Sequence, residues 1–112
     1  MAKVTYDEET DALSIDFSAK KTYASLEVSA HFVVDVAATN QPTGIELLNA
    51  SEVLGKLFGF KVKKSDLHKL SFNVNKEAIE KNEELYATFQ LGEKQARVLI
   101  PTNYQSPVAA SG

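Results

Sequence analysis

The sequence predicts one α+β domain, built mostly as an antiparallel β meander with a single short helix near residues 50–58. Apolar and polar residues alternate with period two along most of the chain, as they do in strands that have one buried face. The links between these segments are short and polar, and short links join antiparallel strands. A length of 112 residues, 44% of them hydrophobic and 24% charged, suits one globular domain.

Five strands are predicted in the first half, near residues 3–6, 12–17, 23–28, 31–37 and 43–48. The alternation is clearest at Leu13, Ile15 and Phe17, which are separated by Ser14 and Asp16. We expect these strands to form a meander of hairpins. A Greek-key connection would show the same alternation, so the strand order stays open.

An apolar stripe at helical spacing predicts the helix. Its members, which we assign to the core, are Val53, Leu54, Leu57 and Phe58. Asn49 and Glu52 resemble a capping box at the N-terminus, and Gly59 suits the C-terminus.

Alternation resumes after a lysine-rich link and predicts three more strands. The apolar residues that would face inward are Leu70, Phe72, Val74, Leu85, Ala87, Phe89, Leu91, Ala96, Val98 and Ile100. Gly92-Glu93-Lys94 marks a tight hairpin between the last two strands, and residues 75–82 predict a helical turn or an exposed loop. Residues 1–104 would form the domain, and the tail at 105–112 would be flexible.

The composition excludes several classes of protein. Without cysteine there is no disulfide, no thiolate metal site and no thiol nucleophile. The first residues lack the apolar segment of a signal peptide, and no apolar run approaches the ~18–20 residues of a membrane helix. We therefore expect a cytoplasmic protein with no membrane partner and no cofactor.

Charge is divided unevenly along the chain. Residues 1–52 carry nine acids and three lysines, whereas residues 53–112 carry six acids and nine bases. Five lysines gather within a short segment: Lys56, Lys61, Lys63, Lys64 and Lys69. Such a cluster could bind nucleic acid weakly. The net charge of −3 and the single arginine, Arg97, argue against that alternative, and a solvated surface explains the cluster more simply.

Strand parity places several carboxylates on the outer face of the first sheet. The residues that would share this face are Ser14, Asp16, Glu27, Val33, Asp35, Glu46 and Leu48. Asp16, Asp35 and Glu46 could hold a divalent metal and support acid–base chemistry, although an ordinary hydrated face is the simpler interpretation. Val33 and Leu48 are unexpected on a fully exposed face, so we take them as candidate interface residues.

The other chemistry-bearing residues form no catalytic motif. His31 and His68 lie at a strand start and in a charged link, away from any nucleophile motif. The glycines are scattered and form no phosphate-binding loop. Gly44 is expected to supply a positive φ in the turn before its strand.

Five short segments occur in an order and spacing typical of one family: Val4–Asp7, Asp11–Ile15, Glu27-Val28, Val33–Val36 and Gly44–Ser51. Through them, residues 4–51 resemble the small prokaryotic domain-of-unknown-function family 2283. The resemblance implies a compact antiparallel β module of bacteria, archaea and phages with no established activity and no assigned catalytic residues. Toxin-like genes beside some members imply an antitoxin-like role.

These observations predict a non-enzymatic interaction or binding module, expected as a homodimer or with a small protein partner. A metal-dependent enzyme that uses the acidic face and a nucleic-acid binder that uses the lysines are the two alternatives.

Overall fold

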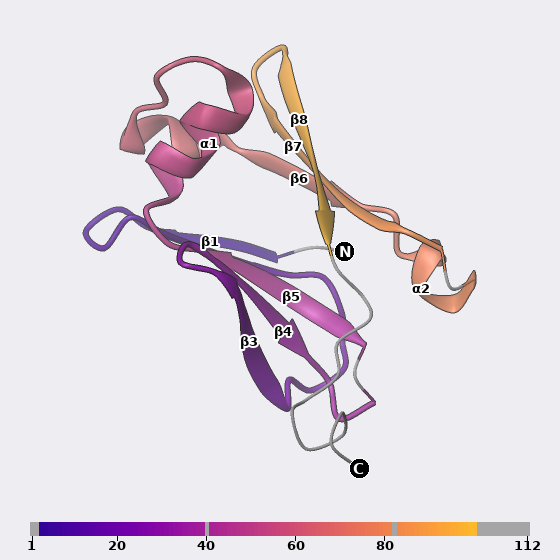
Figure 1. The fold of residues 1–112 in the computed structure, drawn as a ribbon. Helices are drawn as coiled ribbons and strands as arrows, with labels where there is room; N and C mark the ends of the chain where they lie inside the picture. Colours follow the sequence, from indigo (N-terminus) through magenta and orange to yellow (C-terminus); the bar gives the residue numbers. More distant parts are fainter. Residues whose placement is uncertain (1–2, 40, 82, 101–112) are drawn as a thin grey trace.

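The computed structural model describes residues 3–39, 41–81 and 83–100, which form two antiparallel sheets joined by a helical corner (Figure 1). The strands of sheet A, in chain order, are β1 (Lys3–Asp7), β2 (Ala12–Asp16), β3 (Ala24–Ser29), β4 (Phe32–Val36) and β5 (Pro42–Leu47). The corner consists of helix α1 (Ala50–Phe58) and the 3₁₀ helix η1 (Lys64–Lys69). The strands of sheet B are β6 (Ser71–Val74), β7 (Leu85–Leu91) and β8 (Lys94–Ile100), with the short helix α2 (Glu77–Lys81) between the first two.

The α+β fold class and all the predicted elements are confirmed, including the helix at residues 50–58. The hairpin at Gly92 and the helical turn within residues 75–82 are also present. The tail predicted at 105–112 lies outside the described residues. No helix in the described part of the chain is long and apolar enough to cross a membrane.

The strand order of sheet A is β1-β2-β5-β4-β3. The meander is confirmed in β3, β4 and β5, and β1 and β2 form a hairpin. Consecutive strands β2 and β3 are not neighbours, however, because β2 pairs with β5, with Leu13 opposite Leu47. The choice that the sequence left open is therefore a Greek-key connection, in which the link after β2 passes the ends of β5 and β4.

One hydrophobic core lies between the two sheets. The residues at its centre, all nearly inaccessible to solvent, are Leu13, Ile15, Val34 and Ile45 from sheet A, Leu54 from α1, and Leu85, Phe89 and Ile100 from sheet B. Phe17, just after β2, stacks on Phe72 of β6 with 6.4 Å between ring centroids. Each such side chain contributes about 1.5–3 kcal/mol through its burial. Sheet B thus covers part of the inner face of sheet A, and the shared core holds the two sheets and α1 together.

The N-terminus of α1 is capped by a residue from another part of the chain. Asn49 has a φ of 52° and its side chain makes no capping hydrogen bond, so the predicted capping box with Glu52 is wrong. Instead, Asp11 accepts hydrogen bonds from the Ser51 backbone N–H (3.1 Å to Oδ1) and the Ser51 hydroxyl (2.6 Å to Oδ2). The Asp11 carbonyl accepts one more from the N–H of Ala50 at 2.9 Å. At the other end Gly59, with a φ of 82°, terminates the helix as predicted.

Candidate functional site

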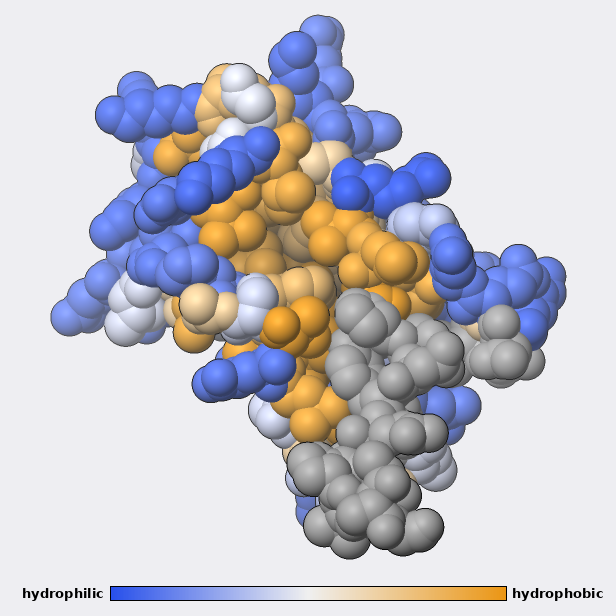
Figure 2. Space-filling model, viewed as in Figure 1, coloured by the Kyte–Doolittle hydropathy of each residue, from blue (hydrophilic) through white to orange (hydrophobic). Residues whose placement is uncertain are grey.

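An apolar groove opens between the two sheets beside α1. We call it the inter-sheet groove; its volume is about 330 Å³. The apolar side chains that line it are Phe32, Ile45 and Leu47 from sheet A, Val53 and Leu57 from α1, and Phe89 and Val98 from sheet B. Figure 2 shows the hollow near the centre of this face, surrounded by hydrophobic residues. A concave apolar surface of this size is typical of a ligand site.

The groove exists because sheet B has three strands and sheet A has five. The narrower sheet leaves part of the inner face of sheet A uncovered, so half-buried Phe32 and exposed Leu57 border an opening. Ile45, Leu47 and Phe89 lie behind it and stay buried. Val53 and Leu57 were assigned to the core, and this assignment is wrong for Leu57, which is 42% exposed and lines the groove. The sequence carries no signal for the open site, because exposed Leu57 and buried Leu54 share the same helical spacing.

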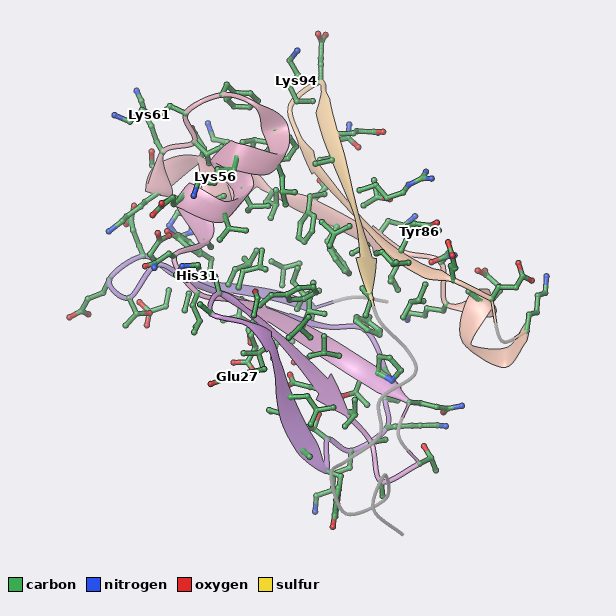
Figure 3. The ribbon with its side chains drawn as sticks, viewed as in Figure 1. Glu27, His31, Lys56, Lys61, Tyr86 and Lys94 are labelled. Carbon is green, nitrogen blue, oxygen red and sulfur yellow. The ribbon has the colours of Figure 1, made fainter. Side chains whose placement is uncertain are left out.

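The polar residues that line the groove are Ser29, His31 and Lys56. His31 lies in the turn between β3 and β4, where its Nδ1 is 3.3 Å from the Asn49 side-chain nitrogen. The Lys56 ammonium projects from α1 and lies 3.5 Å from a Glu52 carboxylate oxygen. Figure 3 shows His31 and Lys56 on the same side of the molecule, one below the other. The ionisable groups among the described lining residues are therefore both bases.

The structure brings the predicted carboxylates together on the outer face of sheet A. Asp16 and Asp35 both lie opposite Gly44 in the strand register, and Glu46 is two residues further along β5. A hydrogen bond with Asp35, partial burial and the charges of Asp35 and Asp16 raise the pKa of Glu46. Asp35 is itself only 8% exposed and accepts a hydrogen bond from the Ser25 hydroxyl at 2.6 Å. Among residues 3–39, 41–81 and 83–100, however, no three His, Asp or Glu side chains are grouped so as to hold a metal ion.

Gly44 is required for a reason other than the predicted one. It lies inside β5 rather than in the preceding turn, and it is not among the residues with positive φ. A Cβ atom at this position would lie 2.6 Å from the Ile15 carbonyl oxygen and 3.1 Å from Asp16 Oδ1. The absent side chain therefore lets β2 approach β5 and lets the neighbouring carboxylates share the space above it.

The two candidate interface residues lie near one another on the outer face. Val33 is half-buried and stands between Glu27 on β3 and Glu46 on β5 in the register. Leu48 follows β5 and is 41% exposed; its backbone N–H donates to the His31 carbonyl at 2.9 Å. The apolar part of this face is thus small and bordered by carboxylates.

The lysine cluster lies at the helical corner. Its members, all exposed, are Lys56 on α1, Lys61 and Lys63 in the following link, and Lys64 and Lys69 on η1. Lys56 and Lys61, with Phe60, border a second hollow of about 540 Å³ beside α1. The arrangement places positive charge near the Phe60 ring.

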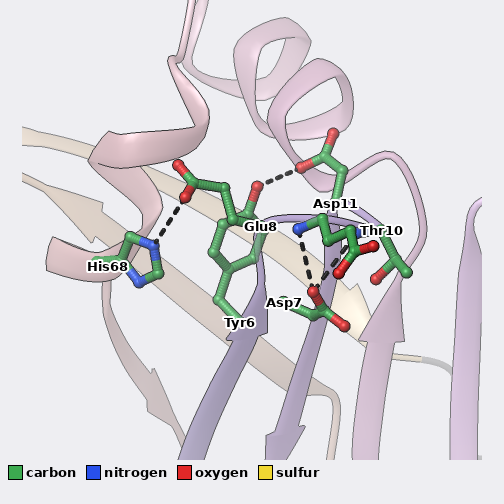
Figure 4. A network of polar contacts seen from close by, with 7 residues as sticks. Tyr6, Asp7, Glu8, Thr10, Asp11 and His68 are labelled. Carbon is green, nitrogen blue, oxygen red and sulfur yellow. Dashed lines mark hydrogen bonds and ion pairs between the residues drawn. The ribbon is translucent and has the colours of Figure 1, made fainter.

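A polar network ties β1 and the β1–β2 turn to the helical corner (Figure 4). The Tyr6 hydroxyl donates to Asp11 Oδ1 at 2.6 Å, and His68 of η1 contacts both the Tyr6 ring, edge to face, and Glu8, with 3.9 Å between Nε2 and Oε2. Burial and the bond to Asp11 raise the pKa of Tyr6. Burial alone would raise the pKa of Asp11, but hydrogen bonds from Ser51 and Tyr6 outweigh it and lower that pKa. Since each polar group already has a partner, we assign this network to stability.

Comparison with protein-family models found a match over part of the chain. The model described as "Protein of unknown function (DUF2283)" matches residues 3–51, which confirms the resemblance seen in the sequence. The matched segment covers sheet A and the first residues of α1, but not sheet B. The comparisons with curated proteins and with solved structures found no match. The groove therefore takes one wall from the matched segment and the others from outside it.

Proposed function

We propose that this chain is a non-enzymatic binding module that holds the apolar part of a ligand in the inter-sheet groove. The observation that supports this function is the groove itself, about 330 Å³ in volume and lined by apolar side chains from both sheets and α1. Small-molecule sites are mostly apolar clefts of about 300–1,000 Å³ with a few polar groups. An apolar group that enters such a cleft removes both its own surface and that of the lining side chains from water.

A neutral apolar dye, N-phenyl-1-naphthylamine, tests this function. We expect its fluorescence to rise on binding and to saturate at one dye per chain. Leu57→Glu places a charge on the wall of the groove, so it should weaken binding by about tenfold or more. Leu99→Glu is the matched control, because Leu99 is 49% exposed but does not line the groove. Unsaturable fluorescence, or equal affinity in both variants, would contradict the proposal.

Self-association through the outer face of sheet A is a second candidate. It is supported by exposed Leu48 beside half-buried Val33, since apolar residues on a sheet face suit a contact between copies. It is opposed by Glu27 and Glu46, because a symmetric contact would bring carboxylates of the two copies together. Val33→Lys combined with Leu48→Lys should dissociate such a dimer in sedimentation or native mass spectrometry. A dimer that survives this double variant but not Leu99→Lys would place the interface on sheet B.

The resemblance to the family supports a further proposal about biological context, namely an antitoxin-like role with a small protein partner. Native mass spectrometry of protein purified gently from its own host reports subunit number, retained partner and bound metal in one spectrum. A small protein in stoichiometric amount would support the antitoxin-like role. A bare monomer that carries a metal would instead favour enzymology on the acidic face.

A further inference from the structure

The charge at the inter-sheet groove points to a class of ligand. Of the described residues that line it, the ionisable ones are His31 and Lys56, and no carboxylate lines it. A ligand held there would place its apolar part among the side chains of both sheets and any charged end beside these two bases. The positive charge of the Lys56 ammonium favours an anionic end. This step rests on the proposed function.

Lys56 is available to bind a ligand, because its ion pair with Glu52 is exposed. Its nearest acidic partner is Glu52, at 3.5 Å, and the two side chains are 79% and 66% exposed. An exposed pair of this kind, four residues apart on a helix, adds little to stability. Moving the flexible ammonium from Glu52 to a ligand carboxylate at the groove therefore costs little, and the new contact is less screened beside an apolar wall.

His31 supplies a second donor. The Asn49 side-chain nitrogen lies 3.3 Å from Nδ1. When this amide donates to Nδ1, the neutral imidazole carries its proton on Nε2, so that Nε2 is the donor left for a ligand. His31 and Lys56 thus reach the groove from different elements, the β3–β4 turn and α1, and each offers a donor to an anionic group there.

The volume limits the length of the apolar part. A water molecule occupies about 30 Å³ of liquid, and a methylene group is of similar size, so 330 Å³ accommodates about ten such groups. Half-buried Phe32, Val53 and Val98 come from sheet A, α1 and sheet B, and with exposed Leu57 they offer accessible apolar surface to an alkyl chain. Phe89 lies buried behind them.

We propose that the inter-sheet groove binds a free medium-chain alkyl carboxylate, with its chain between the sheets and its carboxylate at Lys56 and His31. The chain supplies most of the affinity, since each buried methylene strengthens binding by about fourfold. The two bases select the acid over a neutral chain of the same length.

Displacement of N-phenyl-1-naphthylamine by decanoate and by decan-1-ol, below their micelle or solubility limits, tests the proposal. Decanoate should compete about tenfold more strongly than decan-1-ol. Lys56→Gln should remove most of this preference and leave competition by decan-1-ol unchanged. Lys94→Gln is the matched control, because it removes an equal charge from a residue that does not line the groove. His31→Gln should reduce the preference in part.

The outcomes separate this inference from the proposed function. Equal competition by acid and alcohol overturns the inference and leaves the groove as an apolar site. Displacement by an acidic amphipathic peptide but by neither small molecule overturns it in favour of a protein partner. Failure of the dye to bind contradicts the proposed function as well. About ten methylene groups fill the groove, so further ones stay in water. Affinity that keeps rising about fourfold per methylene from decanoate to hexadecanoate would therefore also overturn the assignment.

Discussion

At the scale of single residues, Asp11 joins parts of the chain that lie 40 positions apart. It accepts hydrogen bonds from Tyr6 and Ser51 while its own backbone has a φ of 54°. Asp11→Ala removes the helix cap, leaves the Tyr6 hydroxyl without its partner and places alanine in a left-handed conformation. We expect it to lower the free energy of unfolding by about 2–3 kcal/mol, measured by urea denaturation.

The pH dependence of that effect has a definite sign. The pKa of Asp11 is lower in the folded protein than its ordinary value of 3.8. Its ionised form therefore stabilises the fold fully above pH 3.8, and this contribution is lost as the pH falls through the lower, folded pKa. Asp11→Asn is the control, because it keeps the shape and tolerates the positive φ. The stability difference between wild type and Asp11→Asn should shrink below about pH 4; a constant difference would show that the charge plays no part.

The negative charge of Glu46 lowers the stability of the fold, whereas that of Asp11 raises it. Because Asp35, burial and Asp16 raise its pKa, the ionised form costs stability, and that cost appears as the pH rises through the raised, folded pKa. Glu46→Gln should therefore be more stable than wild type at pH 7, and the two should converge below the ordinary pKa of 4.5. Thermal melting at a series of pH values measures this. A less stable Glu46→Gln at pH 7 would contradict the repulsion.

The same variant addresses the metal-dependent alternative. If Asp16, Asp35 and Glu46 bind a divalent cation, Mg²⁺, Mn²⁺ or Ca²⁺ should raise the melting temperature of wild type and not that of Glu46→Gln. Equal melting curves of the wild type with and without these ions would remove the reason to propose a metal-dependent enzyme.

At the scale of elements, the lysines of α1, η1 and the link between them form one positively charged corner. With a net charge of −3 and one arginine in the chain, we expect this corner to bind no polyanion tightly. The protein should pass through a heparin column at low salt. Retention that weakens steeply with added salt, and that Lys61→Gln with Lys64→Gln abolishes, would revive the nucleic-acid alternative.

The strands and the helix were predictable where residues close together in the sequence determine them. The period-two pattern at Leu13, Ile15 and Phe17 and the helical stripe around Leu54 report burial directly, so the strands and α1 appear where expected. The cap of α1 was not predictable, because Asn49 has the right chemistry locally and Asp11 outcompetes it from a distant turn. The need for glycine at Gly44 likewise depends on the carbonyl of another strand, at Ile15.

At the scale of the whole molecule, parity shows which side chains point inward but not how far the opposite layer extends. Phe89 was correctly predicted to face inward, yet it lies behind an open groove because sheet B is narrower than sheet A. The carboxylates of the outer face, by contrast, meet because neighbouring strands in one sheet fix their spacing. The acidic cluster was therefore predictable from the sequence and the groove was not.

The position of β2 beside β5 also sets the order in which the chain can fold. Turns of a few residues close the hairpins β1–β2 and β3–β4 early, because little chain entropy is lost. Pairing Leu13 with Leu47 must instead enclose the whole of β3 and β4 in a loop, and the Asp11 cap on Ser51 forms only with it. High contact order of this kind slows folding. The rate-limiting step for this protein is thus expected to be the docking of its N-terminal hairpin against a preformed three-stranded meander.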